Sequence, residues 1–595
     1  MGLGFAKDGS MKLPARTGMR LWILLFCVSL LPLSVHAQSD SEKLKKFFAD
    51  SFEQQLKDSP EGATGAGHHE YDDRWNDWSK AGRETKREHL QKELDQLKTV
   101  SSAGLSDQEK LSIRLFQYET QSDLTSEDLE THLLRVSQLF GMHTRVYIVF
   151  DRMPGRTVHD YENIIARLHG IPAYVDQNIG ILEEAVQRGI VQPKNVVDLV
   201  AGQLATQARQ DASNTALLAA FRQFPSNIPA AEQTRLKNAA TAAYEKEFLP
   251  AWKKLHDYIA GPYAAKARPN VGLGTIAGGP EAYAVLVRRY TTTTLTPAQI
   301  HKIGEDELKR IETEMLALTR ETGFTGTLPE FEAKMAAMPE QHFTSKDDML
   351  IYCRNVAKII EPNLPNLFKH IPMLLYGIRA IPPDREAATA SNAQAPSPDG
   401  STPGWFNLNA YEPEKQLKSN KESLVLHEAV PGHIFQGSLA RSINDLPEFR
   451  KFYGNSAYSE GWALYVESLG KQLGLYNDPY SRYGQLSSER FRAVRLVVDT
   501  GMHSMGWTRK QAVDFFNAHV PDQSVSEIDR YIAWPGQALS YKLGQLTIQD
   551  LKQKAEQRLG EKFDIREFHD VILRNGGLPM ELLQEQAQKY IDSAK

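Results

Sequence analysis

The stretch LVLHEAVPGHIFQ, residues 424–436, decides how the chain folds around its most informative side chains. It places His427 and His433 on either side of Glu428. In the common HExxH arrangement, two histidines four residues apart lie on one face of a helix and bind one zinc ion beside the glutamate. Here the spacing is six residues, which on a regular helix turns the second side chain about 240° away from the first. A regular helix therefore cannot bring both imidazoles to one ion.

Two residues inside this stretch predict that the helix is interrupted. Pro431 removes a backbone donor and clashes with the preceding turn, while Gly432 allows a loosened backbone beside it. We expect a bulged or broken turn, with two extra residues, that returns His433 to the side of His427. The alternative is a helix end at the surface with two incidental histidines. The apolar residues on both sides of the motif favour a buried helix, in which histidine and glutamate need partners.

A third ligand is needed, because a catalytic zinc site usually has three protein ligands and one water. Residues 455–470, NSAYSEGWALYVESLG, contain Glu460 and Glu467 one heptad apart on a predicted helix that is otherwise rich in bulky apolar side chains. We expect Glu460 to be the third ligand and Glu467 to orient one of the histidines. Two alternatives stay open: either glutamate faces solvent, or Glu467 is the ligand instead.

Four segments in combination resemble the bacterial domain-of-unknown-function 885 family. They are the motif HEAVPGH, the following SEGWALYVE, and the later RAVRLVVDTGMHSMGWT and WPGQALSYKLGQ. The resemblance extends upstream through residues 279–311 and the segment GWFNLNAY, so it covers most of the chain after the N-terminal leader.

That family is similar to helical metallopeptidases of the glutamate-zincin kind, in which a histidine pair and a downstream glutamate bind zinc and an adjacent glutamate acts as base. The resemblance implies that His427, His433 and Glu460 are metal ligands. It also implies Glu428 as the base and a helical architecture around a cleft. The six-residue spacing of the histidines departs from the standard HExxH peptidases.

A hydrolase of this kind also needs a donor for the tetrahedral oxyanion, commonly a tyrosine or a histidine. Arg495, Asp499 and His503 follow one another at four-residue steps and lie along one helical stripe. His503 is one candidate donor, since two glycines near it allow another segment to approach; Arg495 with Asp499 is equally explained by a simple ion pair. Tyr541, which follows a Trp-Pro-Gly break, is the second candidate. Its alternative role is that of a core tyrosine with a satisfied hydroxyl.

Apolar residues at three- and four-residue steps predict helices over most of the remaining chain. Residues 403–413, PGWFNLNAYEP, instead alternate apolar and polar side chains and predict a short strand, which as an edge strand could hold an extended peptide. The fold class that we expect is mainly α, with a small β-sheet near the metal-binding helix. Residues 261–279 interrupt the helices, so we divide the mature chain into an N-terminal helical region, residues 38–270, and a catalytic region, residues 271–595.

Residues 1–37 have the features of a cleavable signal peptide. Arg16 and Arg20 precede the apolar run LWILLFCVSLLPLSV, and the small residues that end at Ala37 indicate cleavage after it. The alternative is an uncleaved signal anchor. No other run is long enough to span a membrane, so we expect export and no membrane association once the leader is removed.

The two cysteines are Cys27, inside the leader, and Cys353. An exported protein without a disulfide is more typical of the bacterial periplasm than of the eukaryotic secretory route. The Leu-Leu-Phe before Cys27 lacks the small side chains expected before a lipidated cysteine, so the sequence does not predict a lipoprotein. The formal net charge of −5 gives no basic bias toward nucleic acid.

These features together predict an exported zinc-dependent hydrolase, in the first place a metallopeptidase, in which Glu428 deprotonates the water that attacks a peptide bond. One alternative keeps the metal but cleaves another amide or an ester, because the same chemistry is indifferent to what flanks the carbonyl. A second alternative is a periplasmic binding or assembly protein whose metal is structural, which four protein ligands with no open position would favour. Exopeptidase or endopeptidase action and the oligomeric state stay open.

Overall fold

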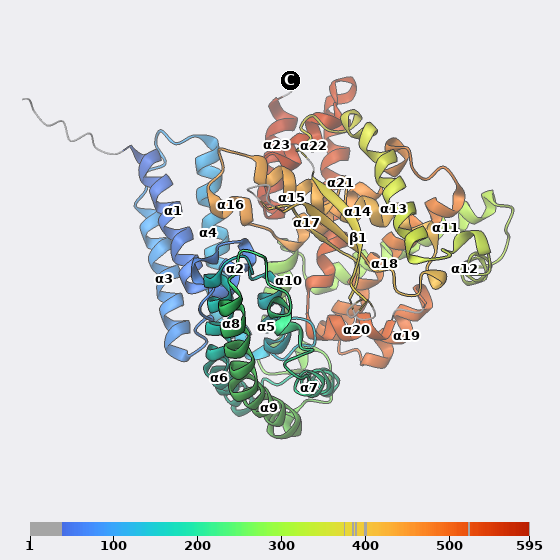
Figure 1. Cartoon of the computed structure of the whole chain (residues 1–595). Coiled ribbons are helices and arrows are strands. Elements are labelled where there is room, and N and C mark those ends of the chain that lie inside the picture. Colours follow the sequence, from blue (N-terminus) through green and yellow to red (C-terminus); the bar gives the residue numbers. More distant parts are fainter. Residues whose placement is uncertain are drawn as a thin grey trace, which may run out of the picture. The chain divides into compact units, whose positions relative to one another are not determined.

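Helices carry most of the described chain, as the apolar periodicity predicts (Figure 1). The computed structural model describes residues 39–373, 375–383, 386, 389–397, 402–521 and 524–593. The predicted signal peptide lies outside these ranges. The helices before the sheet are α1 (Asp40–Asp58), α2 (Pro60–Ala66), α3 (Lys80–Lys98), α4 (Asp107–Asp128), α5 (Met142–Arg152), α6 (Val158–Gln187), α7 (Lys194–Gln207), α8 (Ala230–Ala243), α9 (Leu249–Tyr258), α10 (Gly279–Thr291), α11 (Pro297–Glu321), α12 (Leu328–Ala336) and α13 (Lys346–Ile360).

The helices after the sheet include all that carry the metal motif and the predicted donors. They are α14 (Lys421–Glu428), α15 (His433–Ser442), α16 (Glu448–Phe452), α17 (Ser456–Glu467), α18 (Pro479–Ser504), α19 (Arg509–His519), α20 (Ser524–Ala533), α21 (Ser540–Leu559), α22 (Ile565–Leu573) and α23 (Met580–Ser593).

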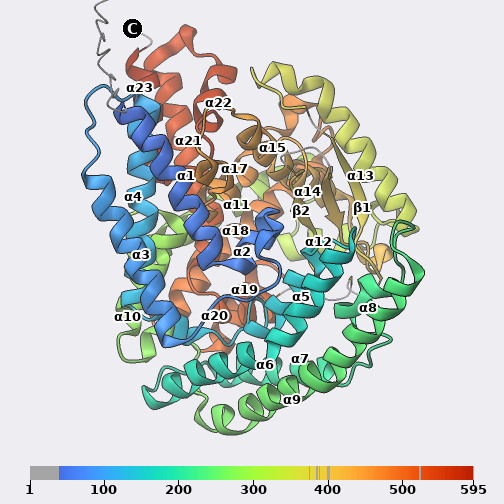
Figure 2. The same ribbon diagram turned by 60° about the vertical axis from the view of Figure 1, so that its left-hand side comes forward.

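The first helices pack along one another. Helices α1, α3 and α4 run side by side in both ribbon views (Figures 1 and 2). Apolar side chains from these helices, including Leu44, Phe48, Leu97 and Phe116, form a separate small cluster between them. Phe449, between α15 and α17 in the sequence, also packs against this cluster and joins it to the rest of the chain. This part of the chain contributes none of the predicted metal ligands.

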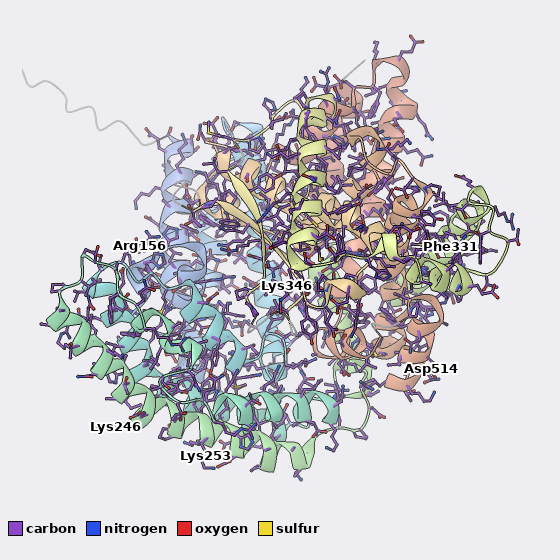
Figure 3. The ribbon with its side chains drawn as sticks, turned by 45° about the vertical axis from the view of Figure 1, so that its right-hand side comes forward. Arg156, Lys246, Lys253, Phe331, Lys346 and Asp514 are labelled. Carbon is purple, nitrogen blue, oxygen red and sulfur yellow. The ribbon has the colours of Figure 1, made fainter. Side chains whose placement is uncertain are left out.

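Helices α6, α8 and α9 form a second packed group, and its amphipathic pattern explains the arrangement. Trp252 and Leu255 on α9 are buried in the large cluster that also contains α6 and α8. Lys246 and Lys253 lie on the outer side of this group, where both are exposed (Figure 3). The sequence here alternates between one face that packs and one face that meets water.

Two large apolar clusters form the core of the described chain. The first joins helices α5–α9 to α11, α12 and α18–α20. The second joins α13, α14, α15 and α17 to the strands and to α21–α23. Residues on both sides of the metal motif, among them Val425, Leu426, Ile434 and Phe435, are buried in the second cluster. The flanking apolar residues therefore bury the motif, as the sequence predicts.

The small sheet lies beside the helices of the metal motif, as predicted. Its strands are β1 (Tyr376–Ala380), β2 (Asn392–Gln394) and β3 (Gly404–Leu408), in the order β1-β3-β2. β1 runs parallel to β3, and β2 pairs with β3 in the antiparallel sense. β3 is the predicted strand, and α15 contacts both β2 and β3. The mainly α fold class with one small sheet is thus confirmed.

The described residues from Asp40 onward form one compact unit. The predicted interruption at 261–279 is a run of short helical turns, among them Ile259–Tyr263 and Leu273–Thr275. The division of the chain near residue 270 stays a prediction. In the part of the chain that the structure describes, no helix combines the length and the hydropathy needed to cross a bilayer.

Candidate metal centre

The metal motif spans a break between two helices. α14 ends at Glu428 and α15 begins at His433, so the two histidines lie at the end of one helix and the start of the next. Ala429 has φ −100° and ψ −95°, and Gly432 has φ −76° and ψ −134°, both outside the helical region. The Val430–Pro431 peptide bond is cis. The structure therefore has the broken turn that the Pro-Gly pair predicts.

Gly432 is the residue that allows this break. A Cβ atom at this position would lie 1.9 Å from the carbonyl oxygen of His427 and 2.3 Å from that of Leu426. These are backbone atoms, which cannot move aside as the end of a flexible side chain can. The loop is also tied to α17, because the indole nitrogen of Trp462 donates to the carbonyl oxygen of Pro431 at 2.8 Å. The backbone thus returns toward the first histidine and is anchored there.

The break brings three predicted ligands together. His427, His433 and Glu460 each offer one ligand atom, and these atoms all lie within 4.8 Å of one another. The Nε2 atoms of His427 and His433 lie 3.5 and 3.3 Å from Oε2 of Glu460. The centres of the two imidazole rings are 4.9 Å apart, and the ring planes are nearly perpendicular. One carboxylate oxygen and two ring nitrogens therefore converge on one point.

A second contact orients each histidine from behind. Nδ1 of His427 lies 2.8 Å from Oε1 of Glu467, which is fully buried. Nδ1 of His433 lies 3.2 Å from the hydroxyl of Ser459. Partners on both Nδ1 atoms leave the Nε2 atoms turned toward Glu460, the arrangement that metal-binding histidines adopt. The structure thus places Glu460 in the converging group and Glu467 behind a histidine.

The electrostatics of this group favour a cation. Burial by itself lowers the pKa of His427, but the hydrogen bonds to Glu460 and Glu467 outweigh it and raise this pKa to about 9. Burial would raise the pKa of Glu460, yet the two histidines hold it well below its usual range. Two imidazole nitrogens and one carboxylate oxygen are also a donor set that catalytic zinc uses. The residues present therefore fit a zinc ion.

Glu428 lies close to the candidate ligands. It directly follows His427 at the end of α14 and is largely buried. Burial raises the pKa of its carboxyl group above the usual range, although the charges of His427 and His433 act in the opposite direction. Its carboxylate is thus close enough to the histidine pair to interact with both charges, and it accepts a proton more readily than an exposed glutamate does.

Tyr541 lies beside the candidate ligands. Its ring stacks on that of His427, with the ring centres 6.5 Å apart and the planes at 16°. Its hydroxyl oxygen accepts hydrogen bonds from Arg530 at 3.2 Å and from Gln537 at 3.5 Å. With both donors directed at that oxygen, the hydroxyl hydrogen remains available to a further acceptor.

His503 is different, and the structure does not support it as an oxyanion donor. Its Nδ1 accepts from the backbone nitrogen of Leu273 at 3.0 Å, and its Nε2 donates to the carbonyl oxygen of Tyr531 at 3.0 Å. Burial lowers its pKa to about 3, so the ring is neutral. Both ring nitrogens are occupied by backbone groups, and the histidine clamps two segments together.

The contact between α17 and α21 positions Glu460 relative to Tyr541. Gly461 and Gly544 meet there: a Cβ on Gly461 would lie 2.4 Å from Cα of Gly544. On α21 the next residue after the tyrosine, Lys542, is buried, with its ammonium group 2.7 Å from Glu307 and 2.6 Å from Glu489. The two helices are therefore held at the closest approach that their backbones allow.

Several residues that contact the candidate ligands or their neighbours were given no role by the sequence analysis. They are Ser459, Arg492, Arg530 and Gln537. Ser459 directly precedes Glu460, and this adjacency is the signal that could have found it. Arg492 lies on α18 with its guanidinium 3.9 Å from Glu467. The packing of α18 and α20 brings the two arginines near the histidines, whereas Gln537 lies four residues before Tyr541, in the turn Gln537–Leu539 that leads into α21.

Comparison with known proteins gives a family and a fold. A family model described as "Bacterial protein of unknown function (DUF885)" matches residues 60–587. A search of curated proteins gave no match. "The crystal structure of the putative lipoprotein from Colwellia psychrerythraea" is similar at a TM-score of 0.88 and 25% identity, covering 93% of this chain and 100% of that one. "The structure of a putative lipoprotein of unknown function from Shewanella oneidensis" is similar at 0.72 and 20% identity, covering 92% and 99%.

Proposed function

Because the chain belongs to the bacterial DUF885 family, whose description assigns no activity, we propose a function from its candidate metal centre: a zinc-dependent hydrolase that cleaves peptides. The observation that carries this proposal is the convergence of His427, His433 and Glu460 with Glu428 directly beside them. Three protein ligands leave one position open, which is typical of catalytic zinc, whereas structural zinc sites usually have four. Among the described residues, the group holds these three.

Each residue has a role that follows from its contacts. A zinc ion held by the three ligands would supply a Lewis acid that polarises the scissile carbonyl and lowers the pKa of water. Glu428 would accept the proton of the attacking water and pass it to the leaving amine. Glu467 and Ser459 hold the histidines with their Nε2 atoms forward.

The oxyanion that forms at the attacked carbonyl needs a fixed donor. Tyr541 is the candidate, since it stacks on His427 and its hydroxyl oxygen already accepts from two side chains. The hydrogen bond from the Arg530 guanidinium makes the phenol a stronger donor, because it draws charge from the oxygen. A donor that is positioned before the reaction needs no rearrangement when the charge develops.

A peptide substrate is supported by the sheet. β2 is an edge strand, and it packs against α15, the helix that begins with His433. An extended peptide could add to such an edge through main-chain hydrogen bonds beside the metal centre. Hydrolysis of another amide or an ester remains the rival, because the residues described act on the carbonyl and not on its substituents.

Export is part of the proposal. The leader predicted at residues 1–37 supports it, and so does the description of each of the two similar structures as that of a "putative lipoprotein". An exported peptidase of this kind would act outside the cytoplasm on peptides that reach the periplasm.

The decisive experiment measures metal and turnover together in three variants. Wild-type protein should contain about one zinc per chain, and His427→Ala/His433→Ala should contain none, by elemental analysis. Glu428→Gln should keep zinc and lose about 10²- to 10⁴-fold in the hydrolysis of a peptide mixture followed by mass spectrometry. The matched control is Glu422→Gln on the same helix, whose carboxylate accepts from the backbone nitrogen of Tyr476 and touches no histidine.

Two results would overturn the proposal. If wild-type protein holds no zinc after an attempt to load it, the three residues are not a metal centre. If Glu428→Gln hydrolyses peptides as fast as wild type, the glutamate is not the base. A panel of peptides, N-acyl amino acids and esters then separates a peptidase from the alternative hydrolases. Turnover of the esters alone would show that the substrate is an ester and not a peptide.

A further inference from the structure

Two arginines beside Tyr541 share a single carboxylate. Arg495 on α18 and Arg530 on α20 both donate to the same oxygen of Glu527, at 3.2 and 3.3 Å. Tyr531 donates its hydroxyl to that oxygen as well. Arginine stays protonated in proteins, so two guanidinium charges face one carboxylate charge. This place is mostly shielded from water and carries an excess of positive charge.

One donor of this group has no acceptor. Arg495 is only 4% exposed. Its Nε donates to the hydroxyl of Tyr531 at 2.9 Å, and its Nη2 donates to Glu527. Its Nη1 is buried and has no hydrogen-bond partner among the described residues. A buried charged donor without a partner costs free energy, so an acceptor that arrives from outside would satisfy it.

The neighbouring acids do not balance the charge. Asp529, next to Arg530 in the sequence, pairs with Arg509 at 2.7 Å. Asp499 lies near enough to Arg530 to be affected by its charge, but burial raises the pKa of Asp499 to about 7, so only part of its charge is present near neutral pH. Arg492, the other arginine on this side of α18, is directed at Glu467 instead.

The arginine pair lies next to the candidate metal centre. The guanidinium of Arg495 is 4.5 Å from the centre of the Tyr541 ring, and Arg530 donates to the hydroxyl of the same residue. That ring in turn stacks on His427. The side chain of Tyr541 therefore contacts both arginines and the candidate ligand His427. A peptide advances about 3.4 Å per residue when extended, so a group two or three residues from the scissile bond can reach the arginines.

We infer that Arg495 and Arg530 form a subsite that binds a carboxylate of the substrate. The inference rests on the proposed hydrolase function and names the class of substrate for the same centre. The planar guanidinium fork matches a carboxylate in geometry and in charge. The carboxylate has two sources, the free C-terminus of a peptide or an acidic side chain near the scissile bond. In the first case the protein removes residues from C-terminal ends.

Binding to an inactive variant tests the subsite without turnover. Glu428→Gln, as purified and after loading with zinc, is titrated by calorimetry with three peptides. They are N-acetyl-tetraalanine with a free C-terminus, its C-terminal amide, and the amide with glutamate as the last residue. We expect one of the two carboxylate peptides to bind about 10- to 100-fold more tightly than the neutral amide. The acid that binds best identifies the source.

Substitution of the arginines gives the second half of the test. Arg530→Gln in the same background should reduce the preference for the carboxylate to within about twofold. Arg495→Lys keeps the charge but loses the fork, and it should lose most of the preference. The matched control is Arg509→Gln. It removes the ion pair between Arg509 and Asp529 on α20, which does not involve Tyr541, and this variant should keep the full preference for the carboxylate. Thermal melting of each variant shows which ones are folded.

Two outcomes overturn the subsite. One is equal affinity for the three peptides, or no binding of any, in the Glu428→Gln protein. The other is a carboxylate preference that survives in both Arg530→Gln and Arg495→Lys. Failure of the proposed function is a separate result, because it consists of missing zinc or missing hydrolysis in wild type. If the protein binds the carboxylate peptide through the arginines but hydrolyses nothing, the subsite is supported and the proposed hydrolase function is rejected.

Discussion

Replacing Glu467 with glutamine tests whether the centre is built for a metal or merely for a buried hydrogen bond. Glu467 is fully buried, and its Oε1 lies 2.8 Å from Nδ1 of His427. Its second oxygen, Oε2, is buried without a partner among the described residues. Arg492 approaches Oε1, the oxygen that contacts His427, at 3.9 Å. Glutamine has nearly the same volume and can still accept from the imidazole. The substitution therefore removes a charge and little else.

The expected effect is a loss of zinc affinity. A carboxylate behind a metal-binding histidine makes the imidazole a better ligand and fixes its orientation, and loss of such a partner typically weakens metal binding 10- to 100-fold. This corresponds to about 1.4 to 2.7 kcal/mol. Glu467→Ala should weaken binding further, because it also leaves Nδ1 of His427 without an acceptor and opens a cavity.

Competition with a chromophoric chelator at fixed pH measures the zinc affinity of each variant. Glu422→Gln is the control, since it removes a half-buried carboxylate from the helix that carries His427 without touching a histidine. A zinc affinity of Glu467→Gln equal to that of Glu422→Gln and wild type would refute the reasoning. It would mean that the contact to His427 is structural and that the centre does not depend on it for metal.

Three further predictions concern the framework of the centre. Gly432→Ala should abolish stoichiometric zinc in elemental analysis, because its methyl group would lie 1.9 Å from the carbonyl oxygen of His427, and zinc-loaded Gly432→Ala would contradict the role of the break. Gly544→Ala should lower the free energy of unfolding, measured by urea denaturation, by about 1 to 3 kcal/mol, because its Cβ would lie 2.1 Å from the carbonyl oxygen of Ala457. An unchanged urea midpoint would show that α17 and α21 move apart without cost. Burial raises the pKa of Asp499 from 3.8 to about 7, so the folded state binds this proton more tightly than the unfolded state does. The resulting stabilisation is complete below about pH 4 and is lost as the pH rises to 7, by ~4 kcal/mol. In urea denaturation measured at several pH values, Asp499→Asn should therefore show a smaller decrease in the free energy of unfolding between pH 4 and 7 than wild type. An equal decrease in both proteins would assign the pH dependence to other groups.

The convergence of ligands could be predicted because its signals are local. The six-residue spacing excludes one continuous helix, and Pro431 with Gly432 names the place of the break. Glu460 and Glu467 stand one heptad apart on a single helix, and the structure has Glu460 beside both histidines and Glu467 against Nδ1 of His427. Their roles as ligand and as orienting residue stay predictions.

His503 shows what local reasoning cannot supply. Its helical position and neighbouring glycines are compatible with an exposed donor, but the backbone of Leu273 and the carbonyl of Tyr531 occupy both ring nitrogens. Leu273 lies 230 residues away in the sequence and Tyr531 lies 28 residues away on another helix. Arg495 is a similar case, since the candidate pair with Asp499 gives way to Glu527 on another helix. A side chain on a buried helix has several possible neighbours, and tertiary packing selects among them.

The sheet illustrates the same limit for secondary structure. β3 alternates buried and half-buried residues, which is the period of a strand, and its sequence predicts it. β2 has only three residues and no buried side chain, so nothing in its own sequence distinguishes it from a loop. It is a strand because β3 offers its edge.

Tyr541 and Lys542 are consecutive on α21, so their side chains leave the helix about 100° apart. The ammonium of Lys542 is held by Glu307 on α11 and Glu489 on α18, which fixes the rotation of α21 about its own axis. The ion pairs of Lys542 therefore also fix the direction in which the Tyr541 side chain leaves the helix. A redesign of the proposed oxyanion donor must keep the two ion pairs of Lys542, although they lie outside the candidate metal centre, because a small rotation of this helix would redirect the phenol.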